Sequence, residues 1–348
     1  MIDACDSCLR RARLVGHLAP RIAGLIDRPG RRRPGLLALD DEQLISAVAG
    51  SEAGAVQRAL DPTAIGDERE RLAGRGLGAV CRHSLGYPSS LFELADPPAA
   101  LFTQGRHEML GELTAVPSVA VVGSRRGSSY GLKAARMIGR GLGAAGVPVV
   151  SGLALGIDAA AHRGCLDAHG SPVAVLAGGP ERAYPRSHEQ LYQRIAAAGL
   201  VLSEMPPGST AFRWSFPARN RIMAGLATMT LVVEAADPSG SLITADFARD
   251  IGRLVGAVPG PITSRLSEGG NGLLRDGAVP ITRVEDLLDE LFGATGHERS
   301  GRTTRILVPD DPVLRAVFDG VERGLGVEQT AQETGLNASE VRAALGRL

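Results

Sequence analysis

The sequence predicts an α/β protein in which a parallel sheet is flanked by two small helical units. Two observations predict this class. From residue 119 onward, short apolar runs rich in β-branched residues alternate with helical stretches. These runs are apolar throughout, which is typical of parallel strands covered on both faces by helices. We expect a helical N-terminal domain over 1–85, the sheet domain over 86–293, a linker over 294–310 and a C-terminal unit over 311–348.

The length of 348 residues leaves room for two or three domains. Apolar residues make up 44% of the chain and charged residues 22%, which argues against wholesale disorder. No apolar run reaches the roughly 18 residues of a membrane helix. The first 14 residues also lack the apolar stretch of a secretion signal. We therefore expect a cytoplasmic protein with no membrane partner.

The N-terminal part has helical patterns separated by a linker. Residues 1–26 look helical, and the Arg, Pro and Gly residues of 27–35 interrupt the pattern. A connector at 87–105 predicts a turn, one helical stretch and a short strand. Between linker and connector we expect three helical segments, the first capped by Asp40 or Asp41: 39–48, 52–60 and 67–74.

Six strands are expected in the sheet domain. The loops that follow the carboxyl ends of such strands are where ligands bind in open α/β sheets. The expected strands are 119–123, 147–152, 172–176, 200–204, 229–235 and 254–260.

The C-terminal residues predict a helix-turn-helix, with Gly335 at the turn and a capping box from Asn337 to Glu340. Residues 311–348 contain four arginines and six acidic residues. A net acidic unit binds phosphates poorly, which favours a protein-contact or vestigial role.

Positive charge is concentrated in one stretch, although the formal net charge is zero. Between Arg182 and Arg221 there are six arginines and two acidic residues, a local net charge of +4. Lys133 is the one lysine of the sequence. Guanidinium groups suit phosphates and stack on bases, so a localised anion-binding surface is expected. A merely solvated face is the alternative.

The loop after the first strand of the sheet domain has the features of an anion site. Gly123, Ser124 and Arg125 precede a helix whose N-terminal amides would point at a phosphate. The loop matches neither GxGxxG nor a P-loop. The next strand ends in Ser151 and Gly152, where a dinucleotide site would carry an acidic residue. We expect no NAD and no other cofactor; an ordinary tight turn is the alternative.

Aromatic rings interleave with arginines further along the chain. Single-stranded nucleic acid needs rings for its bases and guanidinium groups for its phosphates. In the alternative interpretation, Phe216 lies in the core, and Arg219 or Arg221 forms bonds within the protein. This alternative is strongest for Arg221. Together with Arg186, the residues in question are Arg213, Trp214, Phe216, Arg219, Asn220 and Arg221.

Two further groups are candidate sites. The predicted start of a second helix, with its small and hydroxyl residues, is a second candidate anion site. Its residues are Ser239, Gly240, Ser241 and Thr244. Asp158 and His162 are four residues apart on a predicted helix, but no nucleophile accompanies them. We expect Asp158 to orient His162 and both to brace the loop, and we expect no catalytic residues.

The cysteines do not predict a metal site. Cys5 and Cys8 form a CxxC pair, whereas Cys81 and Cys165 are isolated in the sequence. A structural zinc site would require a second closely spaced pair. We therefore interpret Cys5 and Cys8 as two thiols near a frayed terminus.

Several segments, in this order and spacing, resemble the DprA/Smf family of bacterial DNA-processing proteins. The resemblance spans roughly residues 36–348 and is strongest between 119 and 280. The segments are VVGSRRGSSYG, SGLALGIDAAAH, AYPR, LSEMPPG, FPARNRIMAGL, VVEA, SGSLITA, VPGP and GGNGLLRDGA.

The resemblance implies an extended Rossmann-like domain that binds and protects single-stranded DNA without sequence preference. It further implies a homodimer that loads RecA onto strands coated with single-stranded-DNA-binding protein during natural transformation. Such proteins are not enzymes. Many carry a sterile-alpha-motif-like N-terminal domain and a winged-helix-like C-terminal domain; here the terminal unit ends before any wing strands.

The DNA pocket of the family falls on Arg125, Arg186 and Arg213, the last two being Arg where relatives often have Lys. His188 stands where the family usually has Asn. The alternative function is a nucleotide or nucleoside-phosphate hydrolase on a similar fold, but the PGGxGTxxE motif of such enzymes is absent from the sequence. A scaffold protein would not need the cluster of arginines and aromatic residues.

Overall fold

The computed structural model describes residues 2–26, 36–60, 63–293, 311–322 and 325–345. The chain divides into two compact units, Met1–Ser300 and Gly301–Leu348. Each unit is described by itself. The linkers expected at 27–35 and 294–310 lie outside the described residues.

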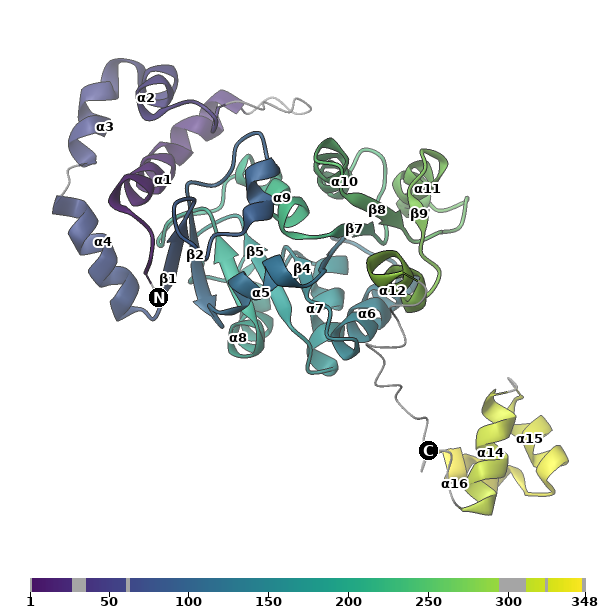
Figure 1. Ribbon diagram of the computed structural model, residues 1–348. Helices are drawn as coiled ribbons and strands as arrows, with labels where there is room; N and C mark the ends of the chain where they lie inside the picture. The colour runs from purple at the N-terminus through teal and green to yellow at the C-terminus, as the bar shows by residue number, and fades with distance from the viewer. Residues whose placement is uncertain (1, 27–35, 61–62, 294–310, 323–324, 346–348) are drawn as a thin grey trace. The chain divides into compact units, whose positions relative to one another are not determined.

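The first unit is built on a nine-stranded, mostly parallel sheet (Figure 1). Its strand order is β1-β2-β6-β5-β4-β3-β7-β8-β9, in which β1 and β2 run antiparallel to their neighbours and the other pairings are parallel. The strands are β1 (Gly78–Cys81), β2 (Ala100–Gly105), β3 (Val119–Val122), β4 (Val149–Ser151), β5 (Pro172–Leu176), β6 (Leu200–Ser203), β7 (Met229–Val232), β8 (Leu254–Ala257) and β9 (Val279–Pro280).

The predicted α/β class is confirmed, and the six predicted runs form β3 to β8. The short strand expected in the connector is β2, after the 3-10 helix Ser89–Glu93. Strands β1 and β9 were not predicted, because β1 (GAVC) contains one β-branched residue and β9 has only two residues. Since β1 pairs with β2, the sheet begins at Gly78, earlier than the boundary expected at residue 86.

Helices cover both faces of the sheet (Figure 1). The two largest apolar clusters each contain buried strand residues, one on each side of the sheet, and two smaller clusters contain others. The first side carries α5 (Met109–Ala115), α9 (Ser215–Leu226), α10 (Gly240–Asp250) and α11 (Glu268–Arg275). The second side carries α6 (Ser129–Ala144), α7 (Ile157–Asp167), α8 (Glu189–Ala198) and α12 (Val284–Phe292).

The N-terminal helices form a third cluster that is continuous with the sheet unit. They are α1 (Asp6–Ile26), α2 (Asp41–Ala49), α3 (Ala53–Ala59) and α4 (Thr63–Gly74). Asp40 caps α2 as predicted, because its carboxylate accepts a bond from the Gln43 amide at 2.8 Å. Trp214 packs into this cluster and donates its indole N–H to the Ala19 carbonyl at 3.0 Å. That ring anchors α1 and does not belong to a surface cluster of rings.

The second unit contains α14 (Pro312–Glu322), α15 (Val327–Thr334) and α16 (Ala338–Leu345) around a small core that includes Val317, Val341 and Ala344. Gly335 ends α15 with a φ of 71°, as the turn requires. Asn337 and Glu340 exchange the bonds of the predicted capping box, at 2.8 and 3.0 Å. The helix-turn-helix prediction is confirmed, and the role of this unit stays a prediction.

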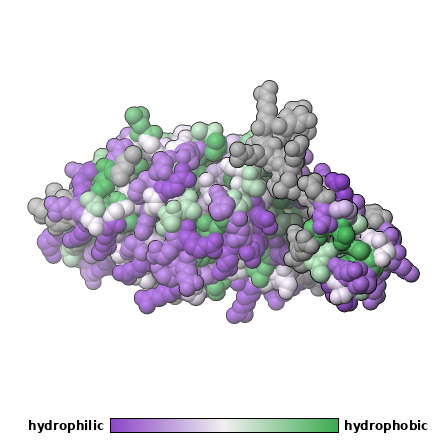
Figure 2. Space-filling view, turned by 90° about the horizontal axis from the view of Figure 1, so that it is seen from below, coloured by the Kyte–Doolittle hydropathy of each residue, from purple (hydrophilic) through white to green (hydrophobic). Residues whose placement is uncertain are grey.

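Among the described residues, no helix has the length and apolar character needed to cross a membrane. On the face drawn in Figure 2, hydrophilic residues predominate and hydrophobic ones lie in small groups.

A buried ion-pair network fixes α9 to the sheet. Arg221 is 2% exposed and donates to both carboxylate oxygens of Glu204, at 2.8 and 2.9 Å, and to Asp96 at 2.9 Å. Burial alone would lower the pKa of Arg221, but the two carboxylates raise it above its ordinary value. The alternative interpretation of Arg221 as an internal residue is therefore confirmed.

We predict that Arg221→Met lowers the free energy of unfolding by about 3–5 kcal/mol, because it leaves two carboxylates without their buried partner. Urea unfolding measures this. Arg136→Ala removes an exposed pair with Asp167 and should cost at most about 1 kcal/mol. Equal losses of unfolding free energy in the two variants would contradict the structural role of Arg221.

Candidate nucleic-acid interface

The candidate site lies where the chain reverses its direction across the sheet. From β3 the strands proceed through β4 and β5 to β6, and β7 then returns to the other side of β3. In open α/β sheets, ligands bind outside the carboxyl ends of the strands at such a switch point. The loops after β3 and β7 meet there, since the Ser124 amide donates to the Glu234 carbonyl at 2.6 Å.

The carboxylate of Glu234 occupies the N-terminus of α6. Glu234 is 3% exposed, and its carboxylate accepts bonds from the Ser128 amide at 2.8 Å and the Ser128 hydroxyl at 2.5 Å. A Cβ at Gly131 would lie 2.2 Å from one of its oxygens, so a larger residue there would have to displace the carboxylate. The expectation that these helix amides point at a phosphate is therefore wrong, because the anion position is filled by the protein itself.

The loop still presents a cation to the surface. Gly123 and Ser124 are partly buried and hold the turn, while the Arg125 side chain is exposed. The guanidinium carbon of Arg125 lies 5.0 Å from the centroid of the Phe216 ring. The centroid of the Tyr184 ring lies 5.2 Å from that of Phe216, and the planes of the two rings form an angle of 51°. Phe216 is half-buried and Tyr184 is 50% exposed, so the cluster joins two ring faces to one guanidinium group.

Arg186 and Arg213 flank this cluster, and both side chains are exposed. Arg186 follows Tyr184 by two residues and Arg213 precedes Phe216 by three. A chain spans at most about 3.6 Å per residue, so their Cα atoms lie within about 7 and 11 Å of those of the two aromatic residues. Three segments far apart in the sequence thus meet at the two rings, and each segment carries one exposed arginine. Sequence reasoning missed Tyr184 as a ring, although an aromatic residue beside Arg186 was a readable signal.

Three of the predicted contact residues are internal. The Ser151 hydroxyl is buried and donates to the Val121 carbonyl at 2.7 Å. Arg219 is 6% exposed and donates to the Val175 carbonyl at 2.9 Å. A Cβ at Gly152 would lie 1.5 Å from an Arg219 nitrogen, so Gly152 makes room for that side chain. The prediction that Ser151, Gly152 and Arg219 contact DNA is wrong, because burial leaves them no accessible surface.

Most residues of the second predicted anion site, at the start of α10, are buried or form hydrogen bonds within the protein. The Ser239 hydroxyl caps α10 and lies 2.8 Å from the Ser241 hydroxyl, and the side chains of Ser241 and Thr244 are buried. Asn220 is buried and donates to the Gly240 carbonyl at 3.0 Å, which ties α9 to α10. These bonds assign a structural role to Ser241 and Asn220. The Thr244 hydroxyl is buried without a hydrogen-bond partner among the described residues. Gly240 and part of Ser239 are at the surface.

Asp158 braces the loop after β4, as predicted. Its carboxylate accepts bonds from the Gly152 amide at 3.1 Å and the Ala154 amide at 3.3 Å. His162 is fully buried, and neither of its ring nitrogens has a hydrogen-bond partner among the described residues. Asp158 therefore makes no hydrogen bond to His162, and the expectation that Asp158 orients His162 is not borne out.

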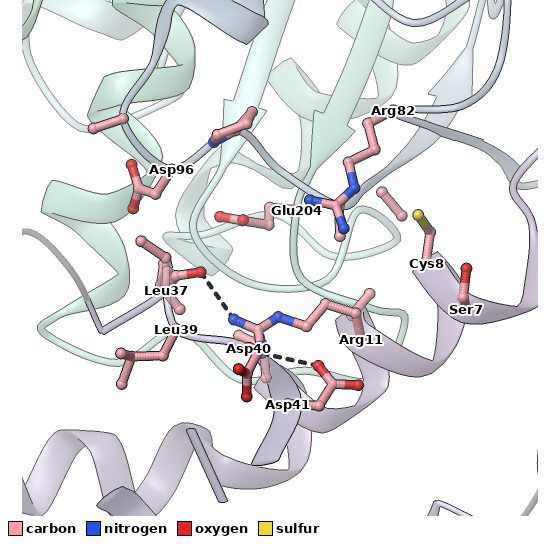
Figure 3. Close-up of a pocket in the computed structure, with 17 residues that line it drawn as sticks. Ser7, Cys8, Arg11, Leu37, Leu39, Asp40, Asp41, Arg82, Asp96 and Glu204 are labelled. Carbon is pink, nitrogen blue, oxygen red and sulfur yellow. Dashed lines mark hydrogen bonds and ion pairs between the residues drawn. The ribbon is translucent and has the colours of Figure 1, made fainter. Parts of the chain in front are cut away.

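A cavity of about 510 Å³ lies elsewhere, between α1, the segment 36–41 and the connector before β2 (Figure 3). Arg11 is engaged there with Asp41 at 3.0 Å and with the Leu37 carbonyl at 2.8 Å. Such a lining does not suit a polyanion, because four carboxylates face two guanidinium groups. Its charged residues are Arg11, Asp40, Asp41, Arg82, Asp96 and Glu204.

The sequence of residues 78–292 matches the family described as DNA recombination-mediator protein A. The chain belongs to this family. The match covers most of the sheet unit, including every segment of the arginine and aromatic cluster.

Curated relatives agree. The chain is 48% identical over 202 residues to the putative DNA processing protein DprA of Mycobacterium tuberculosis, covering 58% of this chain and 49% of that protein. It is 41% identical over 224 residues to Protein Smf of Synechocystis, covering 64% and 56%. The matches thus span about half the length of these two relatives.

Solved structures agree as well. The DprA structure from Streptococcus pneumoniae superposes with a TM-score of 0.65 and 31% identity, covering 83% of this chain and 99% of that one. DNA processing protein A from Helicobacter pylori, described for its single-stranded DNA binding mode, superposes with a TM-score of 0.55 and 28% identity, covering 62% and 95%.

The buried imidazole predicts acid sensitivity. Burial, together with the positive charges of Arg219 and His188, lowers the pKa of His162 to about 3. Below pH 6.5 the unfolded chain binds a proton that the folded protein does not, so His162 removes stability as the pH falls from 6.5 toward 3. At pH 5 the loss is roughly 2 kcal/mol.

We predict that His162→Leu reduces the difference in unfolding free energy between pH 7 and pH 5 by roughly that 2 kcal/mol. Urea unfolding at both pH values measures it. His17→Gln, at an exposed histidine, is the control and should leave the difference unchanged. A His162 variant with the pH dependence of the wild type would refute the prediction.

Proposed function

We propose that this chain binds single-stranded DNA without sequence preference through the surface of Arg125, Tyr184, Arg186, Arg213 and Phe216, hereafter the arginine–aromatic surface. The observation that carries the proposal is the guanidinium group of Arg125 over the Phe216 ring, with Tyr184 as the next ring. Rings offer stacking platforms to any base, and exposed guanidinium groups pair with phosphates. The family membership and the DNA-binding relative from Helicobacter pylori support it.

The filled N-terminus of α6 favours DNA over a small nucleotide. In mononucleotide sites on such sheets, the phosphate binds at the helix N-terminus after the first strand. Here the Glu234 carboxylate accepts the bonds of that position. A nucleotide hydrolase on this fold would have to displace a buried carboxylate, whereas a strand crossing the arginine–aromatic surface would not.

RecA loading and a homodimeric state are part of the same proposal. Membership in a family of recombination mediators supports the loading of RecA onto strands coated with single-stranded-DNA-binding protein, in transformation or in recombination more generally. RecA-dependent ATP hydrolysis on coated strands, with and without this chain, tests it. Acceleration by the chain is expected, and an unchanged rate would contradict it.

The affinity for a labelled dT oligomer, measured by fluorescence anisotropy across salt concentrations, tests DNA binding. The logarithm of the binding constant should fall linearly with the logarithm of the salt concentration, by about 0.7 for each neutralised phosphate. Arg125→Ala should weaken binding and reduce this slope by about 0.7. Phe216→Leu should weaken binding by about 1–3 kcal/mol and leave the slope unchanged, because it removes stacking but no charge.

Arg106→Ala is the matched control. Arg106 follows β2, its amide donates to Gly199 at the amino end of β6, and its side chain pairs with Glu108. This position lies at the edge of the sheet opposite the arginine–aromatic surface, so affinity and slope should be unchanged. Salt-independent binding, or equal losses in the Arg106 and Arg125 variants, would overturn the proposal.

A further inference from the structure

Four metal-ligand side chains converge where the start of α1 meets the end of β1. They are Cys5, Cys8, Cys81 and His83, and their ligand atoms all lie within 4.8 Å of one another. Cys5 and Cys8 flank the first turn of α1, while Cys81 ends β1 and His83 lies in the turn after it. The isolation of Cys81 in the sequence was therefore misleading, because the fold supplies the second pair from 76 residues away.

Three of the six separations among the four ligand atoms are close to those of a tetrahedral metal site, and all six are within 4.8 Å. The Sγ atoms of Cys5 and Cys81 are 3.7 Å apart, and His83 Nδ1 lies 3.3 Å from Cys5 Sγ and 3.4 Å from Cys8 Sγ. A tetrahedron with Zn–S bonds of about 2.3 Å and a Zn–N bond of about 2.05 Å requires separations of about 3.8 Å between sulfurs and about 3.5 Å between sulfur and nitrogen.

We propose that Cys5, Cys8, Cys81 and His83 bind one Zn²⁺ ion as a closed, structural Cys₃His site. Three thiolates and one imidazole complete four-coordination without an open position, as in structural rather than catalytic zinc sites. Soft thiolates with an imidazole select Zn²⁺, whereas iron–sulfur clusters are usually held by four cysteines. Binding replaces the three thiol protons, which pass to solvent.

The surrounding bonds hold the ligands in place. The Cys5 amide donates to Cys81 Sγ at 3.4 Å, and the Cys81 amide donates to the Ser84 hydroxyl at 3.0 Å. The Ser84 hydroxyl in turn donates to the Asp3 carbonyl at 2.8 Å. Cys8 and Cys81 are each 1% exposed, so the site is closed toward the protein and open to solvent on the side of Cys5 and His83.

The ion would join the N-terminal helices to the edge of the sheet. The residues before α1 already bond to β1, since the amides of Asp3 and Ala4 donate to the Ala79 carbonyl at 2.7 and 3.1 Å. A bound metal adds its binding free energy to folding, because the unfolded chain does not preform the site. The zinc site is thus a clamp between α1 and β1, and it is independent of DNA binding.

Metal analysis of the full chain, expressed with added zinc and purified without chelators, tests the proposal. We expect about one zinc ion per chain, and Cys81→Ser should lose it. Cys165→Ala, at a buried cysteine on α7, is the matched control and should keep it. His83→Cys should also keep it, because a fourth thiolate replaces the imidazole, whereas His83→Ala should hold it more weakly.

Two further measurements sharpen the test. Cobalt substitution should give the intense visible absorption of tetrahedral thiolate coordination, and removal of zinc should lower the melting temperature of the wild type but not of Cys81→Ser. A wild-type chain without zinc, a Cys5–Cys81 disulfide in freshly purified protein, or full zinc content in Cys81→Ser would each overturn the proposal.

Discussion

The carboxylate of Glu234 at the N-terminus of α6 is the interaction on which the carboxyl edge of the sheet depends. It accepts the Ser128 amide and hydroxyl at the start of α6, where a phosphate could otherwise bind. The Glu234 carbonyl also accepts the Ser124 amide, which joins the loop after β7 to the loop after β3. An anchored loop gives Arg125 a fixed position over Phe216. Because the Glu234 carboxylate lies where a phosphate would bind, the proposed binding of DNA at this edge relies on exposed side chains.

Burial divides the arginines of this region into two groups with different tasks. Arg219 and Arg221 are internal and hold α9 against strand ends and the connector, through backbone carbonyls or carboxylates. Arg125, Arg186 and Arg213 are exposed around two aromatic rings. The proposed binding of a polyanion by a protein with no net charge would therefore be local, because the arginines with exposed side chains gather near two rings.

Sequence patterns predicted the fold well because the central strands are apolar throughout and the helices between them are long. β1 was missed because its residues, GAVC, contain one β-branched residue, and β9 because it has only two residues. Missing β1 also displaced the first domain boundary. At the site, glycine and hydroxyl residues near helix starts suggested two phosphate cradles. That inference failed because the sequence does not reveal which partner fills a helix N-terminus: Glu234 fills one, and Ser239 caps the other.

Contacts between residues far apart in the chain could not be predicted from the spacing of residues in the sequence. Tyr184 joins Phe216 only through the packing of two loops, and Cys81 joins Cys5 only because β1 pairs with the residues before α1. In both cases local sequence identified half of the group and the fold supplied the other half.

The central claim is that bases stack on the arginine–aromatic surface. Ultraviolet cross-linking of an oligomer containing bromodeoxyuridine, followed by mass spectrometry of the linked peptides, tests it most directly. We expect cross-links at Phe216 or Tyr184. Cross-links confined to the residues that open α10 or to the cavity beside α1, with none at these two rings, would contradict the account.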